Sequence, residues 1–170
     1  MIILGIDPGT ALTGFGAVAY ERAQHRVLGF GCIRTPARDP ESERLLHIHE
    51  RVAELLDTYK PHAVSIEKLF FNKNVQSALS VGQARGVAML AAAQRGIPVY
   101  EYTPTAVKLG VTGQGRAPKS QVGYMVKTLL NLDSVPRPDD VADALALAIC
   151  HAHIGATQQR WQQVAEREGL

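Results

Sequence analysis

The chain begins with a short, nearly continuous apolar run that ends at an acid. Residues 2–6 (IILGI) have the pattern of a strand buried on both faces of a sheet, and Asp7 ends the run. A Pro-Gly-Thr turn follows, and residues 14–19 (GFGAVA) are expected to run back as a second strand. After a short connection, residues 26–35 form a third apolar stretch. The pattern therefore predicts three consecutive antiparallel strands.

Along the rest of the chain, the spacing of the apolar residues alternates between the pattern of helices and that of strands. Apolar residues spaced three and four apart predict a helix from Glu41 or Ser42 to about Tyr59. Further strands are expected at residues 63–66 and 97–100. Further helices are expected at residues 74–94, 104–108 and 120–131. The last helix is expected to follow Asp139, which is expected to cap it. This order predicts an α/β fold, with a mixed sheet of three antiparallel strands followed by parallel strands and with helices flanking it.

Length and composition limit the domain organisation and the compartment. A chain of 170 residues can build one domain with a proper core, expected at residues 1–154, followed by a polar, weakly ordered tail at residues 155–170. No apolar run approaches the ~20 residues that cross a bilayer, and the start lacks the basic region of a secretory signal. The two cysteines, Cys32 and Cys150, suit a reducing compartment. We therefore expect a cytoplasmic protein without membrane contact.

Charge is distributed unevenly along the chain, although the net charge is only +2. One acid, Glu101, lies between residues 68 and 132. The same segment carries eight basic residues: Lys68, Lys73, Arg85, Arg95, Lys108, Arg116, Lys119 and Lys127. This asymmetry favours a surface that binds a polyanion such as nucleic acid, and the alternative is a set of solvated side chains scattered over several faces.

Four acids lie at the ends of predicted elements. Asp7 and Glu67 each follow a buried strand, whereas Asp140 and Asp143 lie three residues apart at the start of the last helix. Asp7 could instead accept hydrogen bonds from its own turn, and Glu67 could be a salt-bridged surface acid. Together, all-oxygen ligands favour Mg²⁺ or Mn²⁺, and such a cluster beside a basic surface suits two-metal phosphodiester hydrolysis. Neither a Ser-His-Asp set nor an activated cysteine competes for this chemistry.

Two loops carry candidate DNA contacts. Phe70 and Phe71 lie among lysines and asparagines, including Lys73, where aromatic rings suit base stacking, although they could also close the core beneath the loop. A glycine-rich basic loop at residues 113–119 lacks the spacing of a nucleotide-binding P-loop. Its Arg116 and Lys119 suit contacts with phosphates.

The helix predicted at residues 74–94 is small or apolar on most faces, which indicates burial on more than one side. Gly82 and Gly86 lie four residues apart on this helix, and each destabilises it by about 1 kcal/mol relative to alanine. Small residues are tolerated where another backbone approaches closely. The approaching partner could be the sheet or a second subunit.

Five motifs, in this order and spacing, closely resemble the RuvC family of bacterial Holliday-junction resolvases: LGIDPGTALTGFG, IEKLFFNKN, GQARGV, GQGRAPKSQV and DDVADALALAICHAH. The resemblance covers about residues 1–153 and implies a ribonuclease-H-like fold. It also implies a homodimer that nicks four-way DNA junctions in symmetric pairs with Mg²⁺ or Mn²⁺, and a RuvA–RuvB branch-migration complex as partner.

The resemblance assigns roles to particular residues. The family's four metal-binding acids fall on Asp7, Glu67, Asp140 and Asp143. Phe70 matches the aromatic residue expected at the junction centre, and Lys108 and Lys119 match basic DNA contacts.

Other classes of protein share part of the pattern. The segment IDPGTALTG is also similar to the phosphate-binding hairpin of actin-like sugar kinases and chaperones, but the second phosphate hairpin and the second lobe of those proteins are lacking. A non-catalytic junction-binding module is expected to lack at least one of the four acids, and all four are present. A related ribonuclease-H-like enzyme that acts on RNA stays a minor alternative.

Overall fold

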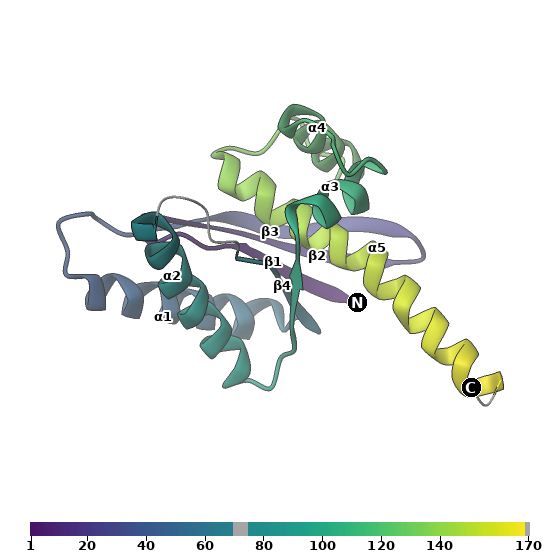
Figure 1. Ribbon diagram of the computed structural model, residues 1–170, viewed down its shortest axis with the longest axis horizontal. Helices are drawn as coiled ribbons and strands as arrows, with labels where there is room; N and C mark the ends of the chain where they lie inside the picture. Colours follow the sequence, from purple (N-terminus) through teal and green to yellow (C-terminus); the bar gives the residue numbers. More distant parts are fainter. Residues whose placement is uncertain (70–74, 169–170) are drawn as a thin grey trace.

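The strands of the computed structural model, which describes residues 1–69 and 75–168, form one mixed sheet in the order β3-β2-β1-β4-β5 (Figure 1). The first three strands form an antiparallel meander: β1 (Ile2–Asp7), β2 (Leu12–Glu21) and β3 (Gln24–Arg34). The other two, β4 (Ala63–Glu67) and β5 (Val99–Tyr102), extend the sheet in parallel. The predicted mixed sheet is confirmed.

The register of the sheet brings two acids to one edge. Ile6 of β1 lies beside Ile66 of β4 in a parallel ladder, so the next residues, Asp7 and Glu67, end neighbouring strands at the same edge. Asp7 also pairs with Gly14 across the antiparallel ladder to β2. Both acids therefore have positions that the backbone of the sheet fixes.

Helices cover both faces of the sheet (Figure 1). The helices of one face are α1 (Glu41–Tyr59) and α2 (Val75–Ala93), and those of the other are α3 (Pro104–Thr112), α4 (Lys119–Leu129) and α5 (Asp139–Glu168). Alternate residues of β1 face the two cores. Leu4 packs into the core below α1 and α2, whereas Ile3 packs into the core below α3, α4 and α5. The predicted burial of β1 on both faces is confirmed.

Two glycines let the backbone of α5 lie directly against the sheet. A Cβ atom at Gly5 would lie 1.9 Å from the carbonyl oxygen of Ala144, and one at Gly14 would lie 2.1 Å from that of Asp140. Both distances are far below any tolerated contact, so only glycine permits this approach. The close approach sets the start of α5 over the strand ends.

Some element boundaries differ from the expected ones. The strand expected at residues 97–100 begins at Val99, because the N–H of Ile97 donates to the carbonyl of Ala92 at the end of α2 (3.0 Å) and not to the sheet. Helix α5 begins at Asp139, whose carboxylate pairs with Lys119 and Arg137, so Asp139 opens the first turn and does not cap it.

The backbone of α5 continues to Glu168 and passes through the domain boundary expected at residue 154, which stays a prediction. Among the described residues, no helix is both long enough and apolar enough to cross a membrane.

Candidate active site

The first pair of acids lies at the edge of the sheet. Asp7 is half-buried at the end of β1, and Glu67 is exposed at the end of β4. Because β1 lies in the middle of the sheet and is covered on both faces, the Asp7 carboxyl has little access to water. The strand ends thus hold one shielded and one accessible carboxylate.

The second pair lies on α5. Asp140 is in the first turn of the helix, where the partial positive charge of the helix N-terminus favours an anion, and Asp143 follows three residues later. The contact between Gly14 and the carbonyl of Asp140 holds this turn directly over the β2 residue that pairs with Asp7. Elements that are distant in sequence therefore place all four acids at one end of the sheet.

The pKa values show that the acids influence one another. Burial raises the pKa of Asp7 to about 7, and the charges of Asp143, Asp140 and Glu67 add to the rise, whereas Lys119 opposes it. Desolvation, followed by the charge of Asp143, raises the pKa of Glu67, and Lys119 and Lys108 oppose this rise. A carboxyl group surrounded by like charges needs a compensating cation to stay ionised.

Lys119 supplies part of this compensation. Its Nζ atom lies 2.9 Å from Oδ2 of Asp143 and 3.4 Å from Oδ2 of Asp139. Desolvation of the ammonium group lowers the pKa of Lys119, but the hydrogen bonds and charges of the two aspartates outweigh it and raise the pKa above its usual value. The lysine expected to contact DNA is thus bound to one of the four acids.

The donor chemistry of this cluster fits a hard divalent cation, because four carboxylates offer only oxygen ligands and the burial of Asp7 disfavours an uncompensated charge. Within residues 1–69 and 75–168, no three His, Cys, Asp or Glu side chains already converge as a ready-made metal site. The four acids therefore form an electronegative cluster, neutralised in part by Lys119, and not a closed coordination shell.

Two of the hollows in the described part of the chain are each lined by two of the four acids. One, of about 190 Å³, is lined by Glu67 and Asp143 together with Lys108 and Lys119. The other, of about 180 Å³, is lined by Asp7 and Glu67 and, on the α2 side, by Arg85. Each hollow combines acids with basic side chains, an arrangement that can accept a phosphodiester beside a cation.

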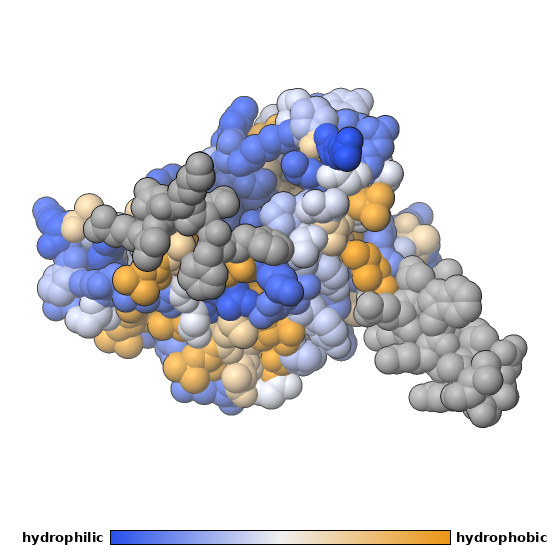
Figure 2. Space-filling model, in the orientation of Figure 1, coloured by the Kyte–Doolittle hydropathy of each residue, from blue (hydrophilic) through white to orange (hydrophobic). Residues whose placement is uncertain are grey.

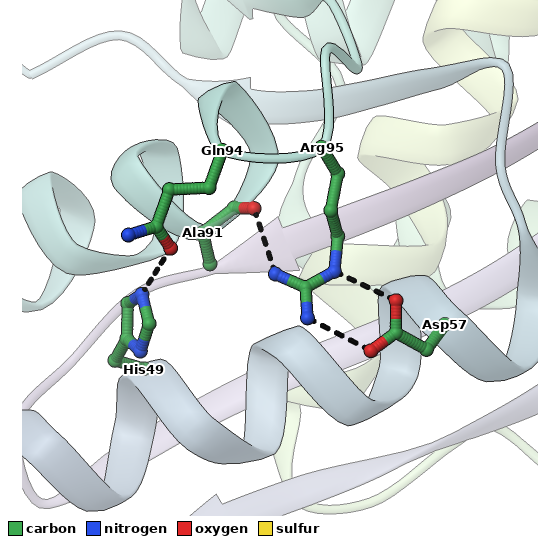
Figure 3. A network of polar contacts seen from close by, with 5 residues as sticks. All are labelled: His49, Asp57, Ala91, Gln94 and Arg95. Carbon is green, nitrogen blue, oxygen red and sulfur yellow. Dashed lines mark hydrogen bonds and ion pairs between the residues drawn. The ribbon is translucent and has the colours of Figure 1, made fainter.

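The predicted basic surface is only partly available for DNA. Lys108 is half-buried in the first hollow, and Arg116 is exposed in the loop before α4. Arg85, however, pairs with Glu101 on β5. Arg95 donates two hydrogen bonds, of 2.7 and 2.8 Å, to Asp57 of α1 (Figure 3). Arg85 and Arg95 thus each pair with an acid from another element of the fold.

The remaining predicted residues lie on α2 and in the loop before it. Phe70, Phe71 and Lys73 lie outside the described residues. Gly86 is exposed, and a Cβ atom there would meet no described atom within 4 Å, so the sheet is not the partner that requires this glycine. At Gly82 a Cβ atom would lie 3.6 Å from Cδ2 of Leu69, an ordinary contact.

Arg85 is a residue of the site that the sequence did not single out. The sequence shows that Arg85 belongs to the basic segment. It does not show that Arg85 lies beside the hollow lined by Asp7, because this position depends on how α2 packs against the sheet.

Comparisons with known proteins agree on one family. The sequence profile described as "Crossover junction endodeoxyribonuclease RuvC" matches residues 3–151. A protein of that name from Moorella thermoacetica is 54% identical over 167 residues, which is 98% of this chain and 100% of the relative.

Solved structures show the same similarity. Thermus thermophilus RuvC in complex with a Holliday junction substrate is 40% identical, with a TM-score of 0.89 over 93% of this chain and 96% of that one. The yeast mitochondrial Holliday junction resolvase Ydc2 is 12% identical, with a TM-score of 0.68 over 97% and 85% of the two chains, and so shares the fold.

Proposed function

The chain belongs to the RuvC family of crossover junction endodeoxyribonucleases, and from this membership we propose that it resolves four-way DNA junctions in recombination and repair by paired, symmetric, metal-dependent nicks. The observation that carries the proposal is the gathering of Asp7, Glu67, Asp140 and Asp143 at one end of the sheet. Relatives of the chain are named crossover junction endodeoxyribonucleases, and the structure of the relative from Thermus thermophilus has been solved in complex with a Holliday junction.

The four acids supply the ligands for two divalent cations, Mg²⁺ or Mn²⁺. When bound, such cations lower the pKa of the attacking water and stabilise the negative charge on the leaving 3′ oxygen. Asp7 and Glu67 offer oxygens from fixed strand ends, and Asp140 and Asp143 offer them from the first turns of α5. Because Asp7 is shielded from water and repelled by its neighbours, its carboxylate gains the most from a compensating positive charge.

The basic side chains position the DNA backbone. Lys108 and Lys119 line the hollow that Glu67 and Asp143 also line, and so can contact phosphates next to the cleaved bond. A phosphate that binds Lys119 takes the lysine away from Asp143 and frees that carboxylate for a cation. Arg116, exposed in the loop before α4, extends the contact along the strand. Phe70 and Lys73, which lie outside the described residues, are assigned to the junction centre by resemblance alone.

Two copies of the chain act together as a homodimer. Two leucines on α2 are largely exposed, Leu79 at 62% and Leu90 at 52%, and Gly86 lies between them on the helix. Hydrophobic surface is visible over the α1 and α2 side of the molecule in Figure 2. A two-fold pair would present two active sites with the approximate symmetry of a four-way junction. The RuvA–RuvB complex is the further partner that the family implies.

The test is cleavage of a synthetic four-way junction by the purified protein in Mg²⁺ or Mn²⁺. We expect nicks at symmetric positions on two strands, with products that a ligase can seal without further processing. Nicks on one strand only, or equal cleavage of linear duplex and junction, would contradict the proposal. A protein with Asp7→Asn serves as the control for a contaminating nuclease.

A further inference from the structure

A fifth acid lies beside the four proposed metal ligands. Asp139 is the first residue of α5, directly before Asp140 and one helical turn before Asp143. Residues four apart on a helix share a face, so Asp139 and Asp143 carry their carboxylates on the same side of α5. Both reach Lys119 there, since its Nζ atom lies 2.9 Å from Oδ2 of Asp143 and 3.4 Å from Oδ2 of Asp139. One ammonium group is thus shared between two carboxylates.

Arg137 orients the carboxylate of Asp139. Its Nη1 atom donates to Oδ1 of Asp139, whereas the ammonium group of Lys119 lies at Oδ2. The side chains of Arg137 and Asp139 are 77% and 50% exposed, and ion pairs as exposed as this one stabilise a fold very little. The main consequence of the pair is therefore local, because Arg137 occupies one oxygen and leaves the other turned towards Lys119.

The pair of Lys119 and Asp143 forms part of the wall of two hollows. Among the described residues that line the first, of about 190 Å³, the other acid is Glu67. Among those that line the second, of about 350 Å³, the other acid is Asp139. An ammonium group that moves from Asp143 to Asp139 therefore moves away from the hollow that Glu67 lines.

Lys119 competes with a divalent cation for Asp143. Oδ2 of Asp143 accepts a hydrogen bond from Nζ of Lys119, and an ammonium group at this distance repels a cation that binds the same carboxylate. Without a second partner, the lysine would have to return to water before a cation could bind. With Asp139 in place, it moves to a carboxylate that is already 3.4 Å away. The second carboxylate thus lowers the free energy needed to release Asp143.

We propose that Asp139 is a positioning residue, which accepts the ammonium group of Lys119 when a divalent cation binds Asp143. The inference rests on the proposed function, because Asp143 is one of the metal ligands named there. Asp139 acts through Lys119 and not on the cation, since its two oxygens face Arg137 and Lys119. It also keeps the lysine within the site, where a phosphate of the DNA can bind it.

The test is a double-mutant cycle on metal binding. Mn²⁺ is titrated into the full-length protein without DNA, and binding is followed by the rise in melting temperature. The four proteins are the wild type, Asp139→Asn, Lys119→Met and the double variant, and their melting temperatures without metal show whether each one folds. Asp133→Asn, which removes an exposed negative charge outside the cluster, is the control for net charge. The Mn²⁺ concentration for half-maximal cleavage of a four-way junction is measured as well.

Asp139→Asn should weaken Mn²⁺ binding more when Lys119 is present than in the Lys119→Met background. The expected difference between the two losses is about two- to five-fold, which is the strength of one exposed ion pair. The loss that both backgrounds share measures the direct attraction between Asp139 and the cation. Asp139→Glu keeps a carboxylate for the lysine and should restore most of the affinity. Junction cleavage by Asp139→Asn should need correspondingly more Mn²⁺, whereas Asp133→Asn should resemble the wild type.

Three results would overturn the inference and leave the proposed function standing. Equal losses in the two backgrounds would show that Asp139 acts on the cation directly. Tighter Mn²⁺ binding by Asp139→Asn, seen only when Lys119 is present, would show that Asp139 holds the lysine on Asp143. The third result is cleavage by Asp139→Asn that needs no more Mn²⁺ than cleavage by the wild type. A wild type that does not cleave the junction in Mn²⁺ would instead overturn the proposed function, and this inference with it.

Discussion

Replacing Asp7 with asparagine should abolish cleavage and, in the absence of metal, make the protein more stable. Asparagine has nearly the same shape but carries no charge, so it removes the repulsion from Asp143, Asp140 and Glu67 and the burial of an ionised group. The pKa of Asp7 rises from 3.8 to about 7. Each factor of ten in proton affinity is worth about 1.4 kcal/mol, so ionised Asp7 destabilises the fold by at most about 4 kcal/mol.

The sign of this effect depends on pH. Above pH 7 the carboxyl is ionised in both the folded and the unfolded chain, and the full penalty applies. As the pH falls from 7 towards 3.8, the folded chain binds a proton that the unfolded chain does not, and the penalty shrinks. Below the unfolded pKa it vanishes. Asp7→Asn should therefore gain most over the wild type at alkaline pH and nothing at pH 3.

Half-burial of the side chain reduces the expected gain to about 2 kcal/mol, which corresponds to a melting temperature about 4–8 °C higher for a domain of this size. The assay is thermal melting in EDTA at pH 8 and at low pH, with Asp133→Asn as the control, because Asp133 is an exposed acid outside the cluster. Added Mg²⁺ should stabilise the wild type more than the variant, since a ligand stabilises only the state that binds it. Normal cleavage by Asp7→Asn, or an unchanged melting temperature at pH 8, would refute the reasoning.

Three further predictions concern DNA and the dimer. Lys108→Ala and Lys119→Ala should each reduce the slope of log affinity for the junction against log salt by about one unit, and an unchanged slope would place the lysine off the DNA path. Phe70→Ala should impair junction cleavage with little change in melting temperature, because stacking on a base contributes about 1–3 kcal/mol to DNA binding. A loss of about 3–5 kcal/mol of stability with normal activity would indicate a core residue instead. Gly86→Leu should give a folded monomer in sedimentation that no longer makes paired nicks, and a wild type that is itself monomeric while cutting both strands together would contradict the dimer.

Local patterns in the sequence predicted the elements well where the signal is strong. The stripe of apolar residues in α1 gave its bounds, because a helix with one buried face repeats its apolar residues every three or four positions. The strand after Ile97 was placed two residues early, because Ile97 and Val99 are both apolar and only the hydrogen bond to Ala92 shows that Ile97 belongs to the end of α2. The pattern of apolar residues cannot show which carbonyl group will accept a hydrogen bond from a given backbone N–H group.

Ion pairs were the part that the sequence could not predict. The eight basic residues looked equivalent along the chain, yet Arg95 reaches Asp57 and Arg85 reaches Glu101, while Lys119 lies between two of the acids of α5. Each pair joins residues from different elements, so its partner is fixed only when the helices pack. The pairing of Lys119 with these acids in the absence of DNA therefore depends on the packing of the site and cannot be read from the basic segment alone.

The four acids come together because of Gly14, a residue that the sequence shows but whose role is apparent only from the packing of the fold. Glycines within a strand weaken it, and so they indicate a place where another backbone comes close. Gly14 pairs with Asp7 in the sheet and at the same time touches the carbonyl of Asp140. One residue without a side chain therefore joins the strand that bears the first acid to the helix that bears the third and fourth. Any Cβ atom at this position would push α5 from the sheet and separate the acids, so the chemistry of the site rests on a glycine that takes no part in it.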